Sequence, residues 1–181
     1  MSFAWASWKF WAKGLGLIFL VIYFWYHPPY VEAAWVAVYV GLAFGVGFFF
    51  TLVVNPILVR FLPTQKTEFS SIGLRRITQA KRRPFVEALL IPGEDGLFFV
   101  PLLLIGANWL SICITALAFG SLHYPEFPLA LCVVKAVFVA LIAVLILPHG
   151  LGTVVTGHLI VDALAYFVWR SSPSPATSAN E

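Results

Sequence analysis

Charged residues are scarce in this chain, since only 10% of its 181 residues are Asp, Glu, Lys or Arg. A soluble domain averages about one quarter charged residues. Here 61% of the residues are hydrophobic and the mean hydropathy is +0.92. So large an excess of apolar side chains requires a lipid solvent. The composition therefore argues against an ordinary soluble domain and predicts a polytopic integral membrane protein.

Cysteine is also scarce. Cys113 and Cys132 both lie in apolar stretches, where a thiol behaves as a small apolar side chain. The chain has neither the cysteine number of a disulfide framework nor the spacing of a zinc finger. Neither kind of small stapled domain is therefore expected.

Six apolar stretches have the length of a membrane-spanning helix, which takes about 20 residues. We expect spans at residues 6–26, 34–59, 84–106, 107–123, 128–147 and 150–169. No internal repeat is visible. The predicted fold is all-α, a bundle of about six transmembrane helices. It divides into two N-terminal helices (1–60), a basic loop (61–84), a core of four helices (85–170) and a disordered tail (171–181).

Basic residues gather between the second and third stretches. They are Arg60, Lys66, Arg75, Arg76, Lys81, Arg82 and Arg83. Nucleic-acid binding is one explanation, but in a short connection between spans the positive-inside bias is the more economical one. We therefore expect a cytoplasmic loop, both termini in the cytoplasm, a plasma (inner) membrane location, lipid as a partner and no nucleic acid.

The first span, 6–26, carries two lysines, Lys9 and Lys13, ahead of its apolar run 14–26. This arrangement is similar to a signal peptide, but no small-x-small cleavage site follows it. We expect the segment to be retained. A third lysine, Lys135, lies inside the fifth span and either snorkels towards the membrane surface or pairs with Glu126.

Glycine and proline predict two local features of the helices. Gly41-x3-Gly45 and Gly47 form a candidate helix-packing face in the second span. Pro92-Gly93 is expected to break or kink the third span. Irregular backbone at membrane depth is tolerated only beside protein or a water-filled cavity, so this position predicts a cavity.

Four ionisable residues, Glu94, His123, His158 and Asp162, lie in apolar stretches. Ionisable groups at membrane depth are functional-site candidates by default. With a helical rise of 1.5 Å per residue, Glu94 lies roughly 13 Å from the cytoplasmic end of its span, and Asp162 and His158 lie roughly 12 and 18 Å from Arg170. His123 ends its span on the same side, so the four residues are expected to converge on one site.

These residues form three short motifs on successive spans. They read Glu94-Asp95-Gly-Leu-Phe-Phe99, Phe119-Gly-Ser-Leu-His123 and His158-Leu-Ile-Val-Asp162. Over residues 85–170 the chain resembles a divergent branch of the CPBP family, which includes the CAAX-prenyl proteases and the bacteriocin-processing or Abi proteins. That family carries Glu-Glu-x3-Arg, Phe-x3-His and His-x3-Asn or Asp.

The resemblance implies an intramembrane endopeptidase that acts on a peptide or lipidated protein. It implies that Glu94 activates a water held by His123, and that His158, oriented by Asp162, stabilises the oxyanion. Asp95 and Phe119 have supporting places in the motifs, although Asp95, turned about 100° from Glu94, is expected to face elsewhere. Phe99 stands where the family has an arginine, which removes a cation that would orient the acidic pair.

Three alternatives remain open at this point. Two histidines and two carboxylates suit zinc, but there is no His-Glu-x2-His helix and the implied mechanism needs no metal, so we expect no cofactor. The missing arginine favours a non-catalytic binding or immunity protein of the same fold. A proton-coupled transporter that uses Glu94 and the histidines as a relay is the third alternative.

Overall fold

The described residues of the computed structural model, 3–54, 56–57, 60, 84–124 and 129–171, form six α-helices and no strand. The helices are α1 (Phe3–Tyr26), α2 (Ala33–Phe49), α5 (Pro84–Ile105), α6 (Trp109–Leu122), α7 (Leu129–Leu145) and α8 (Leu151–Ser171). A π-helical segment, Phe50–Val54, continues α2, and a 3-10 turn, Leu147–His149, precedes α8. The predicted all-α class is confirmed. Most of the predicted basic loop and the tail lie outside the described residues.

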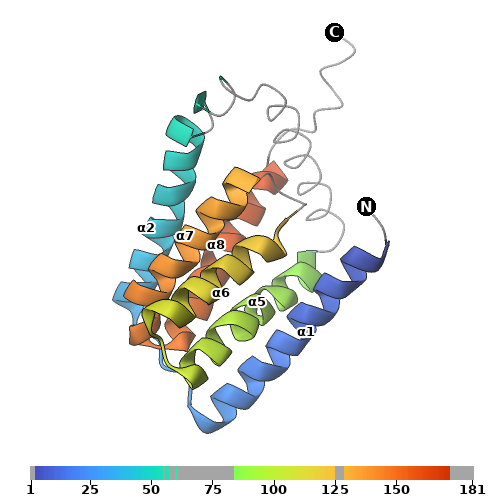
Figure 1. The fold of residues 1–181 in the computed structure, drawn as a ribbon, viewed down its shortest axis with the longest axis vertical. Helices are drawn as coiled ribbons and strands as arrows, with labels where there is room; N and C mark the ends of the chain where they lie inside the picture. Colours follow the sequence, from blue (N-terminus) through green and yellow to red (C-terminus); the bar gives the residue numbers. More distant parts are fainter. Residues whose placement is uncertain (1–2, 55, 58–59, 61–83, 125–128, 172–181) are drawn as a thin grey trace.

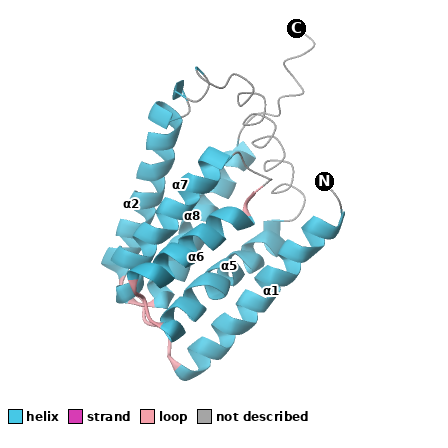
Figure 2. Ribbon diagram, viewed as in Figure 1, coloured by secondary structure: helices cyan, strands magenta, loops and turns pink. Residues whose placement is uncertain are grey.

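The helices alternate in direction along a layered bundle (Figure 1). Three of the links between helices lie together at one end of the bundle, namely α1–α2, α5–α6 and α7–α8 (Figures 1 and 2). The N-terminus lies at the opposite end. Gly106 and Gly150 turn the chain at the first of these ends with φ of 99° and 101°, a conformation that glycine adopts without strain. Asn108 and Ser111 then form a reciprocal capping box at the start of α6.

Close backbone contact joins α1 to α5, which run in the same direction (Figure 1). A Cβ atom added at Gly16 would overlap the carbonyl oxygen of Gly93, and one added at Gly96 would overlap that of Gly16. Small residues permit this approach, as they do in membrane helix pairs. Helix α2 also packs closely on α8, where the absence of a side chain at Gly157 leaves room for the ring of Tyr39.

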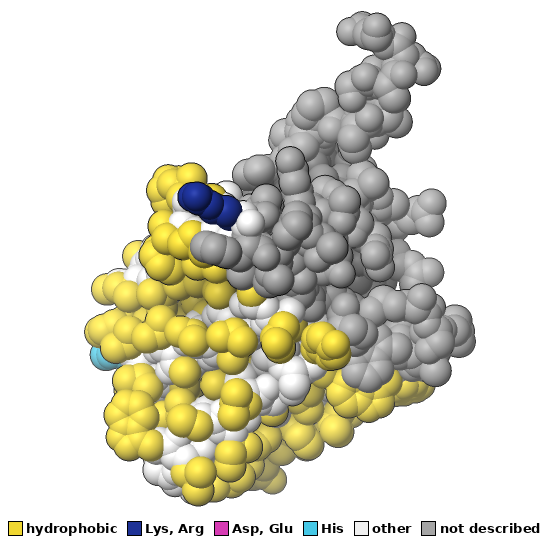
Figure 3. Space-filling view, turned by 45° about the horizontal axis from the view of Figure 1, so that its top comes forward, with side chains coloured by type: hydrophobic (Ala, Val, Ile, Leu, Met, Phe, Trp, Pro, Cys, Tyr) yellow, Lys and Arg dark blue, Asp and Glu magenta, His cyan; other side chains and the backbone are white. Residues whose placement is uncertain are grey.

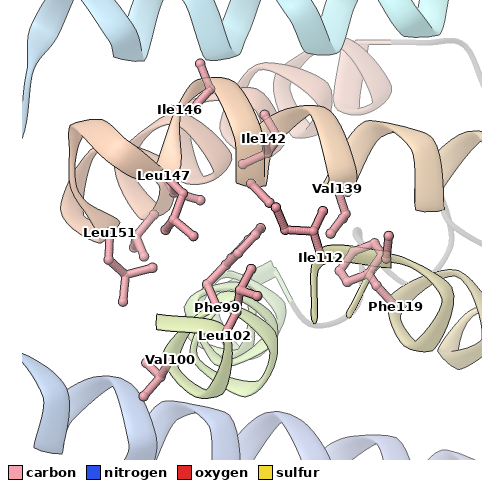
Figure 4. Packing of buried hydrophobic residues seen from close by; sticks show 14 of the residues in the cluster. Phe99, Val100, Leu102, Ile112, Phe119, Val139, Ile142, Ile146, Leu147 and Leu151 are labelled. Carbon is pink, nitrogen blue, oxygen red and sulfur yellow. The ribbon is translucent and has the colours of Figure 1, made fainter. Parts of the chain in front are cut away.

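The core lies among α5, α6, α7 and α8, where large side chains from each helix meet (Figure 4). Phe99 and Leu102 of α5 are 2% and 1% exposed, and Ile142 and Ile146 of α7 are 1% and 0% exposed. Burying an aliphatic or aromatic side chain of this size contributes about 1.5–3 kcal/mol. This core fixes the relative positions of α5 and α8, which carry the acidic and histidine motifs.

The outer surface is also apolar. Bulky side chains remain exposed on every helix that the structure describes, and Trp25, Trp109 and Phe48 are 81%, 76% and 68% exposed. Hydrophobic side chains cover much of the described part of the face in Figure 3. Among the described residues, one helical stretch, Ala33–Val54, is long and apolar enough to cross a membrane, and four shorter helical stretches are also apolar.

Helix α5 continues through Pro92, so the predicted break is wrong, while the alternative of a kink stays a prediction. A proline removes only one helical hydrogen bond, and neighbouring helices support α5 on several sides. The predicted packing face of Gly41, Gly45 and Gly47 makes no close helix contact among the described residues, because Cβ atoms added there would meet no described atom within 4 Å. The helix contact made by small residues instead lies between α1 and α5.

Candidate functional site

A polar pocket of about 170 Å³ lies inside the bundle, beside the acidic motif of α5. Its ionisable and hydroxyl-bearing lining residues come from four helices: Tyr39, Glu94, Asp95, Lys135, His158 and Asp162. Phe99, Phe119 and Phe138 supply much of the apolar wall. Since a water molecule occupies about 30 Å³ in the liquid, the pocket has room for several.

His158 of α8 lies between two aspartates. Its Nδ1 atom is 3.0 and 3.1 Å from the two carboxylate oxygens of Asp95 on α5. Its Nε2 atom is 3.5 Å from Oδ2 of Asp162, one turn along α8. Asp95 is 2% exposed and Asp162 is 39% exposed. Asp95 therefore orients the ring more tightly than Asp162 does.

The expectation that Asp95 faces away from the site is wrong. A rotation of about 100° per residue separates it from Glu94, but α5 lies between α1 and α8 and contacts both. Glu94 consequently contacts α1 while Asp95 contacts α8, and both line the same pocket.

Glu94 forms an ion pair with Lys13 of α1. The Lys13 Nζ atom lies 2.6 Å from Glu94 Oε1, and the two side chains are 18% and 13% exposed. The glycine contacts between the two helices surround this pair, since a Cβ atom at Gly93 would overlap the carbonyl oxygen of Lys13. The backbone of Lys13 is thus held directly against the turn that carries Glu94.

Lys135 of α7 and Tyr39 of α2 complete the polar lining. The Tyr39 ring stacks near His158, with centroids 6.3 Å apart, and Lys135 lies within electrostatic range of Glu94. Three carboxylates thus lie near two ammonium groups and one imidazole. A protonated His158 ring makes this cluster neutral, which is the favourable arrangement for charges away from water.

His123, at the C-terminal end of α6, is buried but is absent from the pocket lining. Its Nδ1 atom lies 2.9 Å from the carbonyl oxygen of Phe119. The donor in this bond is Nδ1–H, so a neutral ring carries its lone pair on Nε2. The imidazole lies within electrostatic range of Glu94. The structure therefore brings Glu94, His158 and Asp162 to one pocket, with His123 beside it.

A second, apolar groove of about 340 Å³ adjoins the polar pocket. It runs between α2 and α8, and Ala43 and Val161 line both spaces. Gly47 and Thr51 line the groove farther along α2. Thr51 belongs to the π-helical segment, and such segments are frequent at functional sites.

A separate polar cluster lies at the end of the bundle where α2 and α8 begin. His149 Nδ1 is 3.1 Å from Glu32 Oε2, and the imidazole stacks on Trp35 with centroids 3.8 Å apart. The Thr153 hydroxyl accepts a bond from the Glu32 backbone N–H and donates one to the His149 carbonyl. These contacts join the starts of α2 and α8, and none of these residues lines the polar pocket.

Within the part of the chain that the structure describes, no group of three or more His, Cys, Asp and Glu side chains is placed to hold a metal ion. The donors instead contact one another, because His158 bonds to Asp95 and Glu94 bonds to Lys13.

Sequence reasoning missed two contributors to the site, Lys13 and Tyr39, and assigned no function to Lys135. Glu126, the suggested partner of Lys135, lies outside the described residues. The sequence does contain a signal for the contact between Lys13 and the acidic motif. Lys13 is an ionisable residue close to Gly16, and Gly93 and Gly96 flank Glu94 and Asp95.

Comparison of the chain with protein-family models, with curated proteins and with solved structures gives no match. The resemblance to the CPBP family therefore rests on the three motifs and their order along the chain.

Proposed function

We propose that the chain is a polytopic membrane protein of the CPBP type that hydrolyses a peptide bond inside the bilayer. The observation that carries this proposal is the shared polar pocket of about 170 Å³, which Glu94 and Asp95 of α5 and His158 of α8 all line and which has room for several water molecules. The apolar exterior around that pocket supports a lipid environment.

In the proposed reaction Glu94 is the general base. Lys13 contacts its Oε1 atom, and we assign the water to Oε2. The carboxylate accepts a proton from the water as the water oxygen attacks the peptide carbonyl carbon. The carboxylic acid then returns that proton to the leaving amine, which breaks the C–N bond.

His158 supports the same reaction from the opposite side of the pocket. Asp95 fixes its ring through Nδ1, and its Nε2–H then donates to the developing oxyanion. The distance of 3.5 Å between His158 Nε2 and Asp162 Oδ2 is long for a hydrogen bond. The Nε2–H group can therefore donate to the substrate instead. One such donor contributes about 3 kcal/mol to transition-state stabilisation.

The proposed substrate is a peptide or lipidated protein that reaches the pocket from the membrane. The groove between α2 and α8 supports this assignment, because it is apolar and shares Ala43 and Val161 with the polar pocket. When an apolar segment of the substrate lies in the groove, the peptide bond adjacent to that segment lies in the polar pocket beside Glu94.

The test is cleavage of membrane peptides by the purified protein in liposomes. Glu94→Gln keeps the shape of the side chain but removes the base, and we expect at least about a 100-fold loss of kcat/KM. The matched control is Glu32→Gln, which removes a carboxylate from the other polar cluster and should retain activity. Equal rates for wild type and Glu94→Gln would remove Glu94 from the mechanism.

One observation favours a second candidate, a non-catalytic membrane binding protein with the same fold. The shortest polar contact of Glu94 is to an ammonium group, and ion pairs of this kind also serve to hold helices together. This alternative predicts that Glu94→Gln lowers the thermal unfolding midpoint of a protein that has no hydrolytic activity to lose.

A further inference from the structure

We propose that Lys13 is a positioning residue of the pocket, whose ammonium group holds the Glu94 carboxylate in its charged form and aims it at the pocket. This inference rests on the proposed function of Glu94, but the charge-holding part can be measured without any substrate.

The first support is the contact itself. The Lys13 Nζ to Glu94 Oε1 distance of 2.6 Å is that of a short, charge-assisted hydrogen bond, and both side chains are mostly buried. An isolated carboxylate away from water tends to take up a proton and become neutral. An ammonium group in contact with it opposes that change.

The second support is the rigidity of the arrangement. Lys13 and Glu94 each lie about 15 Å from the start of α1 and α5, which run in the same direction, so their side chains are level with one another. The backbones touch at Gly16, Gly93 and Gly96. Helix packing therefore holds the backbone of Lys13 beside that of Glu94, which leaves only the lysine side chain to position the cation.

The third support is the nature of residue 99. An arginine at this position would present its cation from α5 itself, but Phe99 is 2% exposed and packs into the apolar core (Figure 4). Lys13 supplies a cation to the acidic motif from another helix. Lys135, which also lines the pocket, lies on α7 and contributes from a different side.

The experiment uses the full chain in liposomes and compares Lys13→Met with Lys13→Arg. Infrared spectroscopy at neutral pH detects a protonated carboxylic acid by its carbonyl band. We expect wild type and Lys13→Arg to lack a band from Glu94. We expect Lys13→Met to show one, which disappears in the Lys13→Met/Glu94→Gln double variant. Lys13→Gln serves as the neutral variant if Lys13→Met does not fold.

Activity provides the second readout. We expect Lys13→Met to lower kcat at least tenfold with little change in KM, Lys13→Arg to restore most of it, and Lys9→Met to leave it unchanged. A Glu94 band in wild type, or its absence from both neutral variants, would overturn the proposal. A rise in kcat for Lys13→Met would also overturn it, because Lys13 would then be inhibitory. If no variant or wild type cleaves peptides, the infrared result still decides the role of Lys13.

Discussion

At the scale of single residues, two aspartates hold the His158 ring unequally. Asp95 is almost fully buried and contacts Nδ1 with both oxygens, whereas Asp162 is 39% exposed and 3.5 Å away. Both carboxylates were visible in the sequence, but their unequal burial was not.

We predict that Asp95→Ala destabilises the protein more than Asp162→Ala does. The first substitution leaves the Nδ1–H of His158 without its buried acceptor, which costs about 1–3 kcal/mol. The second removes a longer, partly exposed contact and should cost less than about 1 kcal/mol. Thermal unfolding in one detergent measures both, and equal losses would contradict the assignment of Asp95 as the main partner.

The sequence predicted Glu94, His123, His158 and Asp162 as one site, because ionisable residues in apolar stretches stand out by their cost at membrane depth. All but His123 line the pocket. It did not predict Lys13, whose contact depends on which helices are neighbours. Hydropathy reveals where a helix lies along the chain but not which helix it touches. The orientation of Asp95 was missed for the same reason, since it follows from the place of α5 between α1 and α8.

At the scale of the elements, the glycine contact between α1 and α5 is the feature that positions Lys13. Gly14 and Gly16 lie two residues apart on α1. A Cβ atom at Gly14 meets nothing within 4 Å, whereas one at Gly16 overlaps the backbone of α5. The two glycines therefore form a matched pair.

We predict that Gly16→Ala lowers the free energy of unfolding by about 1–3 kcal/mol, because α1 must move away from α5. Gly14→Ala should leave stability unchanged or raise it by up to about 1 kcal/mol, since alanine favours a helix more than glycine does. Chemical denaturation of both variants provides the measurement. A neutral effect of Gly16→Ala would mean that the two backbones do not touch.

The groove between α2 and α8 gives a second prediction for the elements. Gly47→Leu fills the groove, so it should raise KM for an apolar peptide without lowering the unfolding midpoint. Gly41→Leu, on the same helix but not lining the groove, should leave KM unchanged. Steady-state kinetics on the two variants separates the outcomes, and identical KM values would exclude the groove as the route of the substrate.

Helix positions were the most predictable part of the fold, because long apolar stretches bounded by turn residues stand out in the hydropathy of the sequence. The expected spans 84–106 and 150–169 lie within two residues of the ends of α5 and α8. Helix contacts were less predictable: the packing face was predicted at Gly41, Gly45 and Gly47, and the contacts at Gly16, Gly93 and Gly96 were not predicted. Small-residue patterns are common, and only packing determines which of them is used.

At the scale of the whole molecule, the proposal requires the bundle to cross the membrane with residues 61–84 in the cytoplasm. We predict that a cysteine at Ser71 reacts with a membrane-impermeant maleimide only after cells are permeabilised, whereas one at Ala107 reacts in intact cells. Cys113 and Cys132 are first replaced by alanine. The reverse labelling pattern would invert the topology, and labelling of both sites in intact cells would contradict a membrane-spanning bundle.

The central claim is that the polar pocket hydrolyses peptide bonds, and the matched histidines His158 and His149 test it most directly. Membranes that contain wild type, His158→Asn or His149→Asn are compared by mass spectrometry for newly formed peptide termini. His158 lines the pocket, while His149 belongs to the cluster at the start of α8. We expect the new termini to form at the same rate with wild type and His149→Asn, and at least about 100-fold more slowly with His158→Asn. New termini that form at the wild-type rate in His158→Asn membranes would contradict this claim.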